Sequence, residues 1–380
     1  MRRRTGYILI FSMVSLLVIG IVMLFSTAAF AQDSRGDMYY FVKRQMMWLV
    51  IGGSALVVAA TVDYRVWARW WPWLYGLAVV LLILCFVPPI GMKINGAWRW
   101  INLGFATFQP SELGKVAVLF SLAWWYQQNE EASGQFWRGF VAPLAIAGLI
   151  MGLIVIEVDL GATALIGTTA LAMMFVAGAG LRWIIPLIAA GAAGLVAAIF
   201  HIEERMGRLL AFIDPEKYKL TEGLQQWQAL LAFGAGGVEG VGLGSGRQKM
   251  LYLPYAHTDF IFPMIGEELG LRFTLLTVFC FLLILLAGVL IAMNSRDRFG
   301  MLLGFGITII ITLQAAINIG VTTSLLPNKG MPLPFISYGG SNLAVSMMLV
   351  GILLNIHRQG RRLPKRRPRA VPATSLAVRF

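Results

Sequence analysis

The apolar residues of this chain are gathered into long blocks, and short polar segments that carry most of the charges separate the blocks. A helix that crosses the hydrocarbon core of a membrane needs about 20 mostly apolar residues. Runs that approach this length occur ten times. We therefore predict ten membrane-spanning helices, at approximately 7–30, 46–62, 73–90, 111–126, 140–156, 162–178, 184–200, 264–291, 301–320 and 342–356.

The composition supports a membrane protein. Hydrophobic residues make up 58% of the 380 positions and charged residues only 13%, whereas soluble domains have about 45–50% apolar and about 25% charged residues. This excludes a soluble enzyme, and so apolar a chain cannot be intrinsically disordered. The predicted fold class is an all-α polytopic integral membrane protein with one transmembrane domain, residues 1–356.

The first apolar run resembles a secretory signal, because arginines at 2–4 precede it and small residues around Ala29 and Ala31 follow it. The apolar part of a signal is about 7–15 residues long, and the run from Tyr7 to Phe30 is longer. We expect an uncleaved first helix.

The distribution of charge predicts the orientation. Short cytoplasmic loops are enriched in Lys and Arg, which places both the N- and C-termini in the cytoplasm when ten helices cross. Lys and Arg number 31 against 18 Asp and Glu. The basic tail, 357–380, is predicted to be disordered and suited to anionic membrane lipid. We expect no nucleic-acid partner.

Most carboxylates fall on the other side of the membrane, where residues 201–263 form a large extracytoplasmic loop between the seventh and eighth helices. A loop of this length is usually functional or disordered. Its apolar residues, such as Leu253 and Phe260, favour packing over disorder. We expect a working surface on the outer face.

Asp259 is the first candidate for chemistry in this loop. It precedes the apolar sequence Phe260-Ile261-Phe262, so partial desolvation would raise its pKa and suit it to act as a general base. The alternative is that Asp259 caps the following helix.

A glycine-rich segment, 240–249, lies earlier in the same loop and ends with Arg247 and Lys249. It lacks the spacing of a nucleotide-binding phosphate loop, and because it lies outside the cytoplasm we expect it to meet no nucleotide. Exposed backbone N–H groups could bind an anion; equally, the glycines could allow close packing. Glu267 and Glu268 follow, either as functional carboxylates at membrane depth or as structural partners of Arg272.

Further candidates lie on other outer segments. Glu112 and Lys115 share a helix face and form either a structural ion pair or a site for an anionic substrate group. The remaining supporting candidates are Trp98, Arg99, Asp159 in a short turn, and Ser337 in a loop rich in proline and glycine. Cys85 and Cys280 lie inside apolar runs, which leaves no disulfide framework or metal cluster.

From Gly6 to Arg358 the chain resembles the SEDS family of bacterial cell-wall proteins (shape, elongation, division and sporulation). The motifs that carry the resemblance are N-G-A-x-R-W at 95–100, Q-P-S-E-x-x-K at 109–115, D-L-G at 159–161, G-L-G-S-G-R-Q-K at 242–249, Y-L-P-x-A-H-T-D-F-I-F at 252–262, E-E-L-G at 267–270 and P-L-P-F-I-S-Y-G-G-S at 332–341. Segments 222–226, 252–257 and 327–332 resemble the division members more than the elongation members, although Leu224, Gly246, Tyr255 and Asn328 depart from the usual pattern.

The resemblance implies a peptidoglycan glycosyltransferase in the bacterial cytoplasmic (inner) membrane that polymerises lipid II by an inverting, β-1,4 transfer. The donor would be the glycan on undecaprenyl diphosphate. Asp259 would be the base; Trp98, Arg99, Glu112, Lys115 and Asp159 would bind substrate or support the site. A divalent cation that shares the diphosphate charge is left open, and no nucleotide is required.

The resemblance also implies a partner, a class B penicillin-binding transpeptidase together with other divisome proteins. Three alternatives stay open: a flippase for the lipid-linked precursor, an elongation-type polymerase, and a scaffold without catalytic activity. A transporter is expected to carry intramembrane charges in both halves, often with an internal repeat. In this chain the carboxylates gather at the outer boundary of the membrane and no repeat is evident, which favours an enzyme over a transporter.

Overall fold

Each of the ten apolar runs coincides with a helix over most of its length in the computed structural model, which describes residues 2–28, 37, 39–94, 96–104, 106–201, 203–250 and 252–361. The ten helices are α1 (Arg2–Ala28), α2 (Tyr40–Thr61), α3 (Tyr64–Leu84), α4 (Pro110–Gln128), α5 (Ala142–Ile156), α6 (Leu160–Val176), α7 (Leu181–His201), α10 (Ile261–Met293), α11 (Arg298–Thr322) and α12 (Gly340–Gly360). Seven helices within the described ranges are long and apolar enough to cross a membrane. The protein is therefore a multi-pass membrane protein. The basic tail beyond Arg361 lies outside the described residues.

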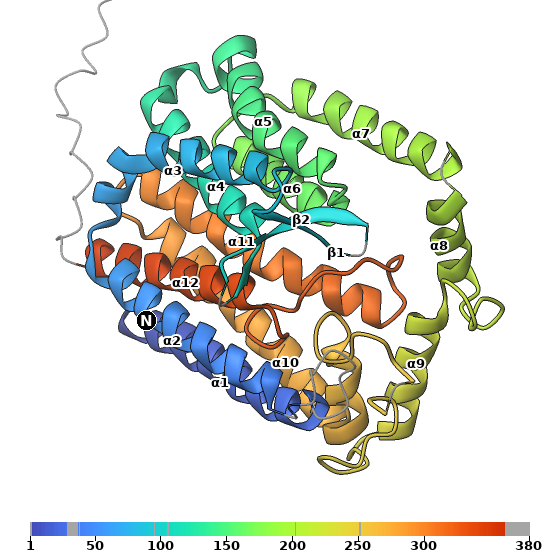
Figure 1. Ribbon diagram of the computed structural model, residues 1–380. Coiled ribbons are helices and arrows are strands. Elements are labelled where there is room, and N and C mark those ends of the chain that lie inside the picture. Colours follow the sequence, from blue (N-terminus) through green and yellow to red (C-terminus); the bar gives the residue numbers. More distant parts are fainter. Residues whose placement is uncertain are drawn as a thin grey trace, which may run out of the picture.

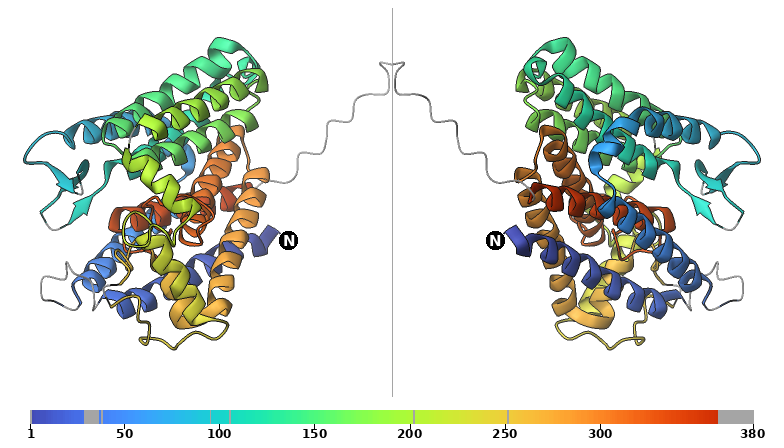
Figure 2. Two further views of the ribbon diagram at one scale, coloured as in Figure 1. Left: turned by 90° about the vertical axis from the view of Figure 1, so that its right-hand side faces the viewer. Right: turned by 90° about the vertical axis from the view of Figure 1, so that its left-hand side faces the viewer.

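The connections contain structure that the sequence analysis did not predict. Two short helices, α8 (Glu203–Ile213) and α9 (Leu224–Gly236), occupy part of segment 201–263, and two single helical turns, η1 (Glu130–Ala132) and η2 (Phe136–Val141), follow α4. An antiparallel sheet joins β1 (Gly91–Ile94), β2 (Ala97–Asn102) and β3 (Thr107–Phe108) in the order β1-β2-β3. The fold is helical with one small sheet, which projects from the bundle (Figure 2).

The sheet forms after Pro88 and Pro89, which end the helical pattern of the preceding apolar run. Trp98, Trp100 and Ile101 are aromatic or β-branched residues, which favour strands, and the β1–β2 register pairs Lys93 with Trp98. The all-α prediction missed this segment because a search for apolar runs of about 20 residues does not detect strands of two to six residues.

Helices α2 and α12 pack closely along their length and lie side by side in Figure 1. Their contact depends on glycine. A Cβ atom at Gly351 of α12 would lie 2.4 Å from the backbone oxygen of Leu56 on α2, and one at Gly52 of α2 would lie 3.0 Å from Cα of Ala344. Small residues allow helix backbones to approach closely in membranes, where van der Waals packing drives association.

One end of the bundle, which we call the basic end, is held together by arginines. Arg298 at the start of α11 donates to the backbone oxygen of Ala177 (2.6 Å) and to Ser133 (3.1 Å). Arg65 of α3 pairs with Asp297 at 2.7 Å. These contacts join the connections α2–α3, α4–α5, α6–α7 and α10–α11. The start of α1 and the end of α12 lie on the same side (Figure 1).

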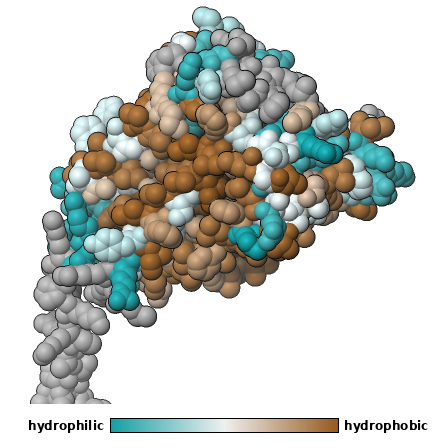
Figure 3. Space-filling view, turned by 90° about the horizontal axis from the view of Figure 1, so that it is seen from below, coloured by the Kyte–Doolittle hydropathy of each residue, from teal (hydrophilic) through white to brown (hydrophobic). Residues whose placement is uncertain are grey.

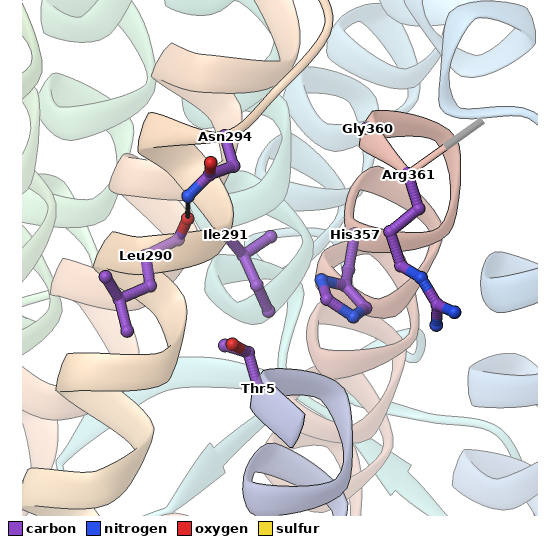
Figure 4. Close-up of a pocket in the computed structure, with 7 residues that line it drawn as sticks. All are labelled: Thr5, Leu290, Ile291, Asn294, His357, Gly360 and Arg361. Atoms are coloured by element: carbon purple, nitrogen blue, oxygen red, sulfur yellow. Dashed lines mark hydrogen bonds between the residues drawn. The ribbon is translucent and has the colours of Figure 1, made fainter. Parts of the chain in front are cut away.

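A small cavity of about 20 Å³ lies at the basic end between the start of α1 and the ends of α10 and α12 (Figure 4). Thr5, Ile291 and His357 face one another across it. The Nε2 atom of His357 is buried without a hydrogen-bond partner among the described residues. A space of this size accommodates about one water molecule, which could satisfy the imidazole.

The opposite end, which we call the loop end, holds the short turn 157–159 and the longer connections 85–109, 237–260 and 323–339. Contacts join them: the backbone N–H of Tyr338, for example, donates to the backbone oxygen of His257 at 3.0 Å. Between the two ends the surface is apolar. Figure 3 shows a hydrophobic band flanked by hydrophilic residues on both sides, as expected for a surface that contacts lipid.

We expect Gly351→Ala to destabilise the protein, because the added methyl group meets a backbone oxygen that cannot move without shifting α2. Overpacking typically costs about 1–3 kcal/mol. The matched control is Gly152→Ala on α5, where an added Cβ meets no atom within 4 Å and Ala favours the helix. Thermal unfolding in detergent should show a loss for the first variant only; equal midpoints would contradict the close contact.

Candidate functional site

Asp259 lies at the loop end, two residues before α10 begins. Its backbone oxygen accepts a hydrogen bond from Nδ2 of Asn318 at 2.7 Å. Its carboxylate faces Gly330, where a Cβ atom would lie 2.6 Å from Oδ2. Helix α10 begins at Ile261, its N-cap residue is Phe260, and no side chain caps it, so the alternative that Asp259 caps this helix is wrong.

The Asp259 carboxylate is half-buried and accepts no hydrogen bond from the residues that the structure describes. Burial raises its pKa to about 6; the Asp159 carboxylate also raises this pKa, and the Arg99 guanidinium lowers it. A carboxylate with a pKa near the working pH is suited to accept a proton. The structure thus brings together three predicted site residues from three segments, Asp259, Asp159 and Arg99, so that their charges interact.

Arg99 on β2 holds the turn that carries Asp159. Its guanidinium donates to the backbone oxygens of Val158 (2.6 Å) and Glu157 (3.3 Å). Val158 has a φ of 65°, a left-handed conformation that is a genuine outlier for a β-branched residue. Strain of this kind persists only where neighbouring groups enforce it. Arg99 supplies such a restraint.

Asp159 itself is nearly buried and has two fixed partners. Oδ1 accepts from the backbone N–H of Ala162 at 3.1 Å and so caps α6, while Oδ2 accepts from Nε2 of Gln109 at 3.2 Å. The adjacent Glu157 is fully buried, and burial raises its pKa to about 8. Glu157 is therefore mostly protonated at neutral pH, and Asp159 provides the negative charge next to Asp259.

The predicted pairing of Glu112 with Lys115 is confirmed, since their charged atoms lie 2.8 Å apart and both side chains are buried. Asn342 of α12 donates to Glu112 at 3.2 Å, and Lys115 donates to Oε1 of Gln314 on α11 at 3.0 Å. The pair thus joins three helices beneath the loop end, and its charges are already matched within the protein.

Two amides on α11 link this pair to Asp259, and the sequence analysis missed both. Gln314 donates to the backbone oxygen of Pro332 at 2.8 Å. Asn318, one turn later, donates to the backbone oxygen of Met331 at 2.6 Å as well as to that of Asp259. Two amides four residues apart inside an apolar run are themselves a signal, because polar groups at membrane depth are costly.

The α11–α12 loop completes the surroundings of Asp259. Ser337 donates to the backbone oxygen of Thr258 at 2.6 Å and accepts from the N–H of Leu333 at 2.7 Å. Lys329 was also missed as a site residue. A Cβ atom at Gly161 would lie 2.9 Å from Cε of Lys329 and 3.5 Å from Oδ1 of Asp159. This lysine therefore lies beside the Asp159 carboxylate.

Glu268 and Lys249 form a second, separate ion pair at 2.6 Å, and both side chains are almost completely buried. Ser26 of α1 donates to Glu268 (2.7 Å), as does the backbone N–H of Gly244 (2.8 Å). Since Lys249 is committed to Glu268, its ammonium group is not open to a phosphate. The predicted phosphate contact is left to Arg247, whose side chain is exposed.

Glu267 accepts hydrogen bonds from the backbone N–H groups of Arg247 (2.7 Å) and Gln248 (3.2 Å). Arg272 pairs with Glu239 at 2.9 Å, so the alternative that it pairs with Glu267 or Glu268 is wrong. A Cβ atom at Gly240 would lie 2.3 Å from the backbone oxygen of Glu268. The glycine-rich segment is thus packed against the start of α10, which favours the close-packing alternative.

Trp98 is half-buried beside Arg99 and makes no aromatic contact with any described residue. A metal site is not apparent in the described ranges either, where no three His, Cys, Asp or Glu side chains are arranged to hold an ion. The chemistry available to the site comes from Asp259, Asp159, Arg99 and Lys329.

Comparison with known proteins identifies the family. The family model of the FtsW/RodA/SpoVE cell cycle proteins matches residues 7–362. This chain belongs to that family, the SEDS proteins. A probable peptidoglycan glycosyltransferase FtsW of Geobacter metallireducens is 39% identical over 93% of this chain and 94% of its own length. The stage V sporulation protein E of Bacillus subtilis is 38% identical, over 90% of this chain and 93% of its own.

Solved structures show the same fold. A chain from the structure described as "Structural coordination of polymerization and crosslinking by a peptidoglycan synthase complex" has a TM-score of 0.76 and 25% identity, over 93% of this chain and 98% of its own. The rod shape determining protein RodA of Thermus thermophilus has a TM-score of 0.68 and 25% identity, over 93% of this chain and 97% of its own. The SEDS resemblance of the sequence is confirmed.

We expect Val158→Gly to leave stability unchanged or to raise it, because glycine adopts a positive φ without the penalty of about 1–2 kcal/mol that other residues incur. The control is Val155→Gly, three residues earlier on α5, where glycine should cost about 1 kcal/mol. Thermal midpoints of the two purified variants provide the measurement. Equal losses would show that the turn is not strained.

Proposed function

We propose that this chain is a peptidoglycan glycosyltransferase that polymerises lipid II on the outer face of the cytoplasmic membrane, for septal wall synthesis in cell division. The observation that carries the proposal is Asp259. It is the one predicted carboxylate whose side chain has no hydrogen bond to a described residue, and its pKa is raised to about 6. The FtsW name of the relatives supports the division role.

In the proposed reaction Asp259 accepts the proton of the sugar hydroxyl of the acceptor lipid II. The oxygen attacks the anomeric carbon of the donor glycan, and the bond to undecaprenyl diphosphate breaks with its electron pair. One displacement inverts the anomeric centre and forms a β-1,4 linkage. Cationic groups stabilise the departing diphosphate; Arg99 and Lys329 lie beside the turn that carries Asp159, and exposed Arg247 is a further candidate.

The remaining predicted residues would act by support. Glu112 and Lys115 hold α4, α11 and α12 together, and through Gln314 and Asn318 they position the backbone beside Asp259. The loops on either side of Asp259 are held by hydrogen bonds to Ser337, Glu267 and Glu268. Trp98 precedes Arg99 on β2 and is half-buried; it would contact substrate.

We further propose that ten helices cross the membrane, with both termini in the cytoplasm and 201–263 outside, as one domain of residues 1–356. The contacts between alternate connections support this, because the arginine-rich connections meet at the basic end and the others at the loop end. A class B penicillin-binding transpeptidase and other divisome proteins are the proposed partners. The relative in a peptidoglycan synthase complex supports a partner of this kind.

Reporter fusions test the topology. A fusion after Arg205 should report an extracytoplasmic position, and one after Arg358 a cytoplasmic position, because arginine-rich connections are retained inside. The reverse result at either position would overturn the ten-helix arrangement.

Asp259→Asn is expected to abolish lipid II polymerisation while the protein stays folded, because Asn keeps the shape of Asp but cannot accept the proton. Loss of a general base typically lowers a rate by about 100- to 10,000-fold. The assay is glycan formation from lipid II by the purified protein with its transpeptidase partner, with the melting temperature measured in parallel.

The matched control is Asp214→Asn, which changes an exposed aspartate in the same outer segment and should leave the rate unaltered. Near-normal synthesis by Asp259→Asn would remove this residue from the mechanism. Lipid II movement across vesicles without glycan from the wild type would favour the flippase instead.

A further inference from the structure

A cavity of about 320 Å³ opens at the basic end, far along α3 and α4 from the site around Asp259. It lies between the first turns of α3, the last turn of α4 and the start of α11. Ligand pockets have volumes of about 300–1,000 Å³, so the space suits a compact group rather than a large substrate. Its lining combines charged, amide and aromatic side chains.

The charge of the cavity is positive. Arg65 on its wall donates to Asp297 through Nε (2.9 Å) and Nη2 (2.7 Å), and Tyr64 donates to the same carboxylate oxygen at 3.0 Å. This pair is neutral as a unit. Arg69, one turn along α3, is exposed and makes no ion pair with the described residues. Its guanidinium is available to an anion.

Amides and indoles provide the rest of the lining. Gln127 and Gln128 at the end of α4 are exposed and can donate hydrogen bonds. Trp71 and Trp124 lie with ring centroids 5.0 Å apart. Tryptophan is enriched at membrane–water interfaces, and Trp73, on the same helix, is 73% exposed. The cavity therefore lies at the depth of lipid headgroups.

We propose that this cavity binds the phosphate headgroup of an anionic phospholipid from the cytoplasmic leaflet. Arg69 contacts the phosphate, Gln127 and Gln128 donate to headgroup oxygens, and Trp71 with Trp124 packs against the glycerol and upper acyl chain. Basic pockets between transmembrane helices on the cytoplasmic side recognise anionic headgroups in this way. A bound lipid would join α3, α4 and α11, and two of these helices, α4 and α11, also support the site from the other end through Lys115 and Gln314.

The test is lipid binding to the intact protein in detergent, measured by native mass spectrometry with phosphatidylglycerol, phosphatidylcholine or inorganic phosphate. We expect the wild type to bind one phosphatidylglycerol in preference to phosphatidylcholine. Arg69→Gln should weaken this binding about fivefold, the contribution of one basic residue near anionic lipid. The control is Arg138→Gln, which removes an exposed charge elsewhere at the basic end and should retain binding.

Equal affinity of the wild type and Arg69→Gln would overturn the proposal, as would an equal loss in both variants, because the attraction would then be a general effect of charge. Inorganic phosphate that competes with the lipid at similar concentration in an Arg69-dependent manner would identify a site for a soluble anion instead. The melting temperature of Arg69→Gln without lipid should match the wild type, since the side chain makes no ion pair with a residue that the structure describes.

Discussion

A charge placed within the membrane-spanning part of a protein must have a partner, since an isolated charge there is costly by several kcal/mol. The buried pair Glu112–Lys115 satisfies this constraint. The hydrogen bonds of this pair also fix the helices beneath the loop end. Asn342 of α12 and Gln314 of α11 add hydrogen bonds to the pair. Three helices are thereby fixed around one polar centre.

The same principle separates the supporting carboxylates from the reactive one. Glu112, Glu268, Glu267 and Asp159 each accept hydrogen bonds or pair with a lysine, and each fixes a helix or loop. Asp259 is held through its backbone oxygen by Asn318, while its carboxylate stays unbonded to described residues. Rigid placement of the main chain and a free side chain are what a general base needs.

The sequence predicted the helices well because hydrophobicity along the chain is a local signal, and all ten apolar runs coincide with helices. It also located the region of Asp259 and the pairing of Glu112 with Lys115, which are three residues apart. The failures concern contacts between distant segments. No local pattern indicates that Arg99 donates to the backbone oxygen of Val158 or that Asn318 donates to the backbone oxygen of Asp259. Nor does one indicate that Lys249 forms an ion pair with Glu268.

The central claim is that Asp259 is a base whose pKa is set by burial and by the neighbouring charge of Asp159. The most direct test is the pH dependence of lipid II polymerisation by the wild type and by Asp159→Asn, a variant that can still cap α6. A base must be ionised, so the wild-type rate should fall as the pH drops through about 6. Without the Asp159 charge the pKa of Asp259 is lower, and this fall should move to lower pH. An acid limb at the same pH in both proteins would contradict the account.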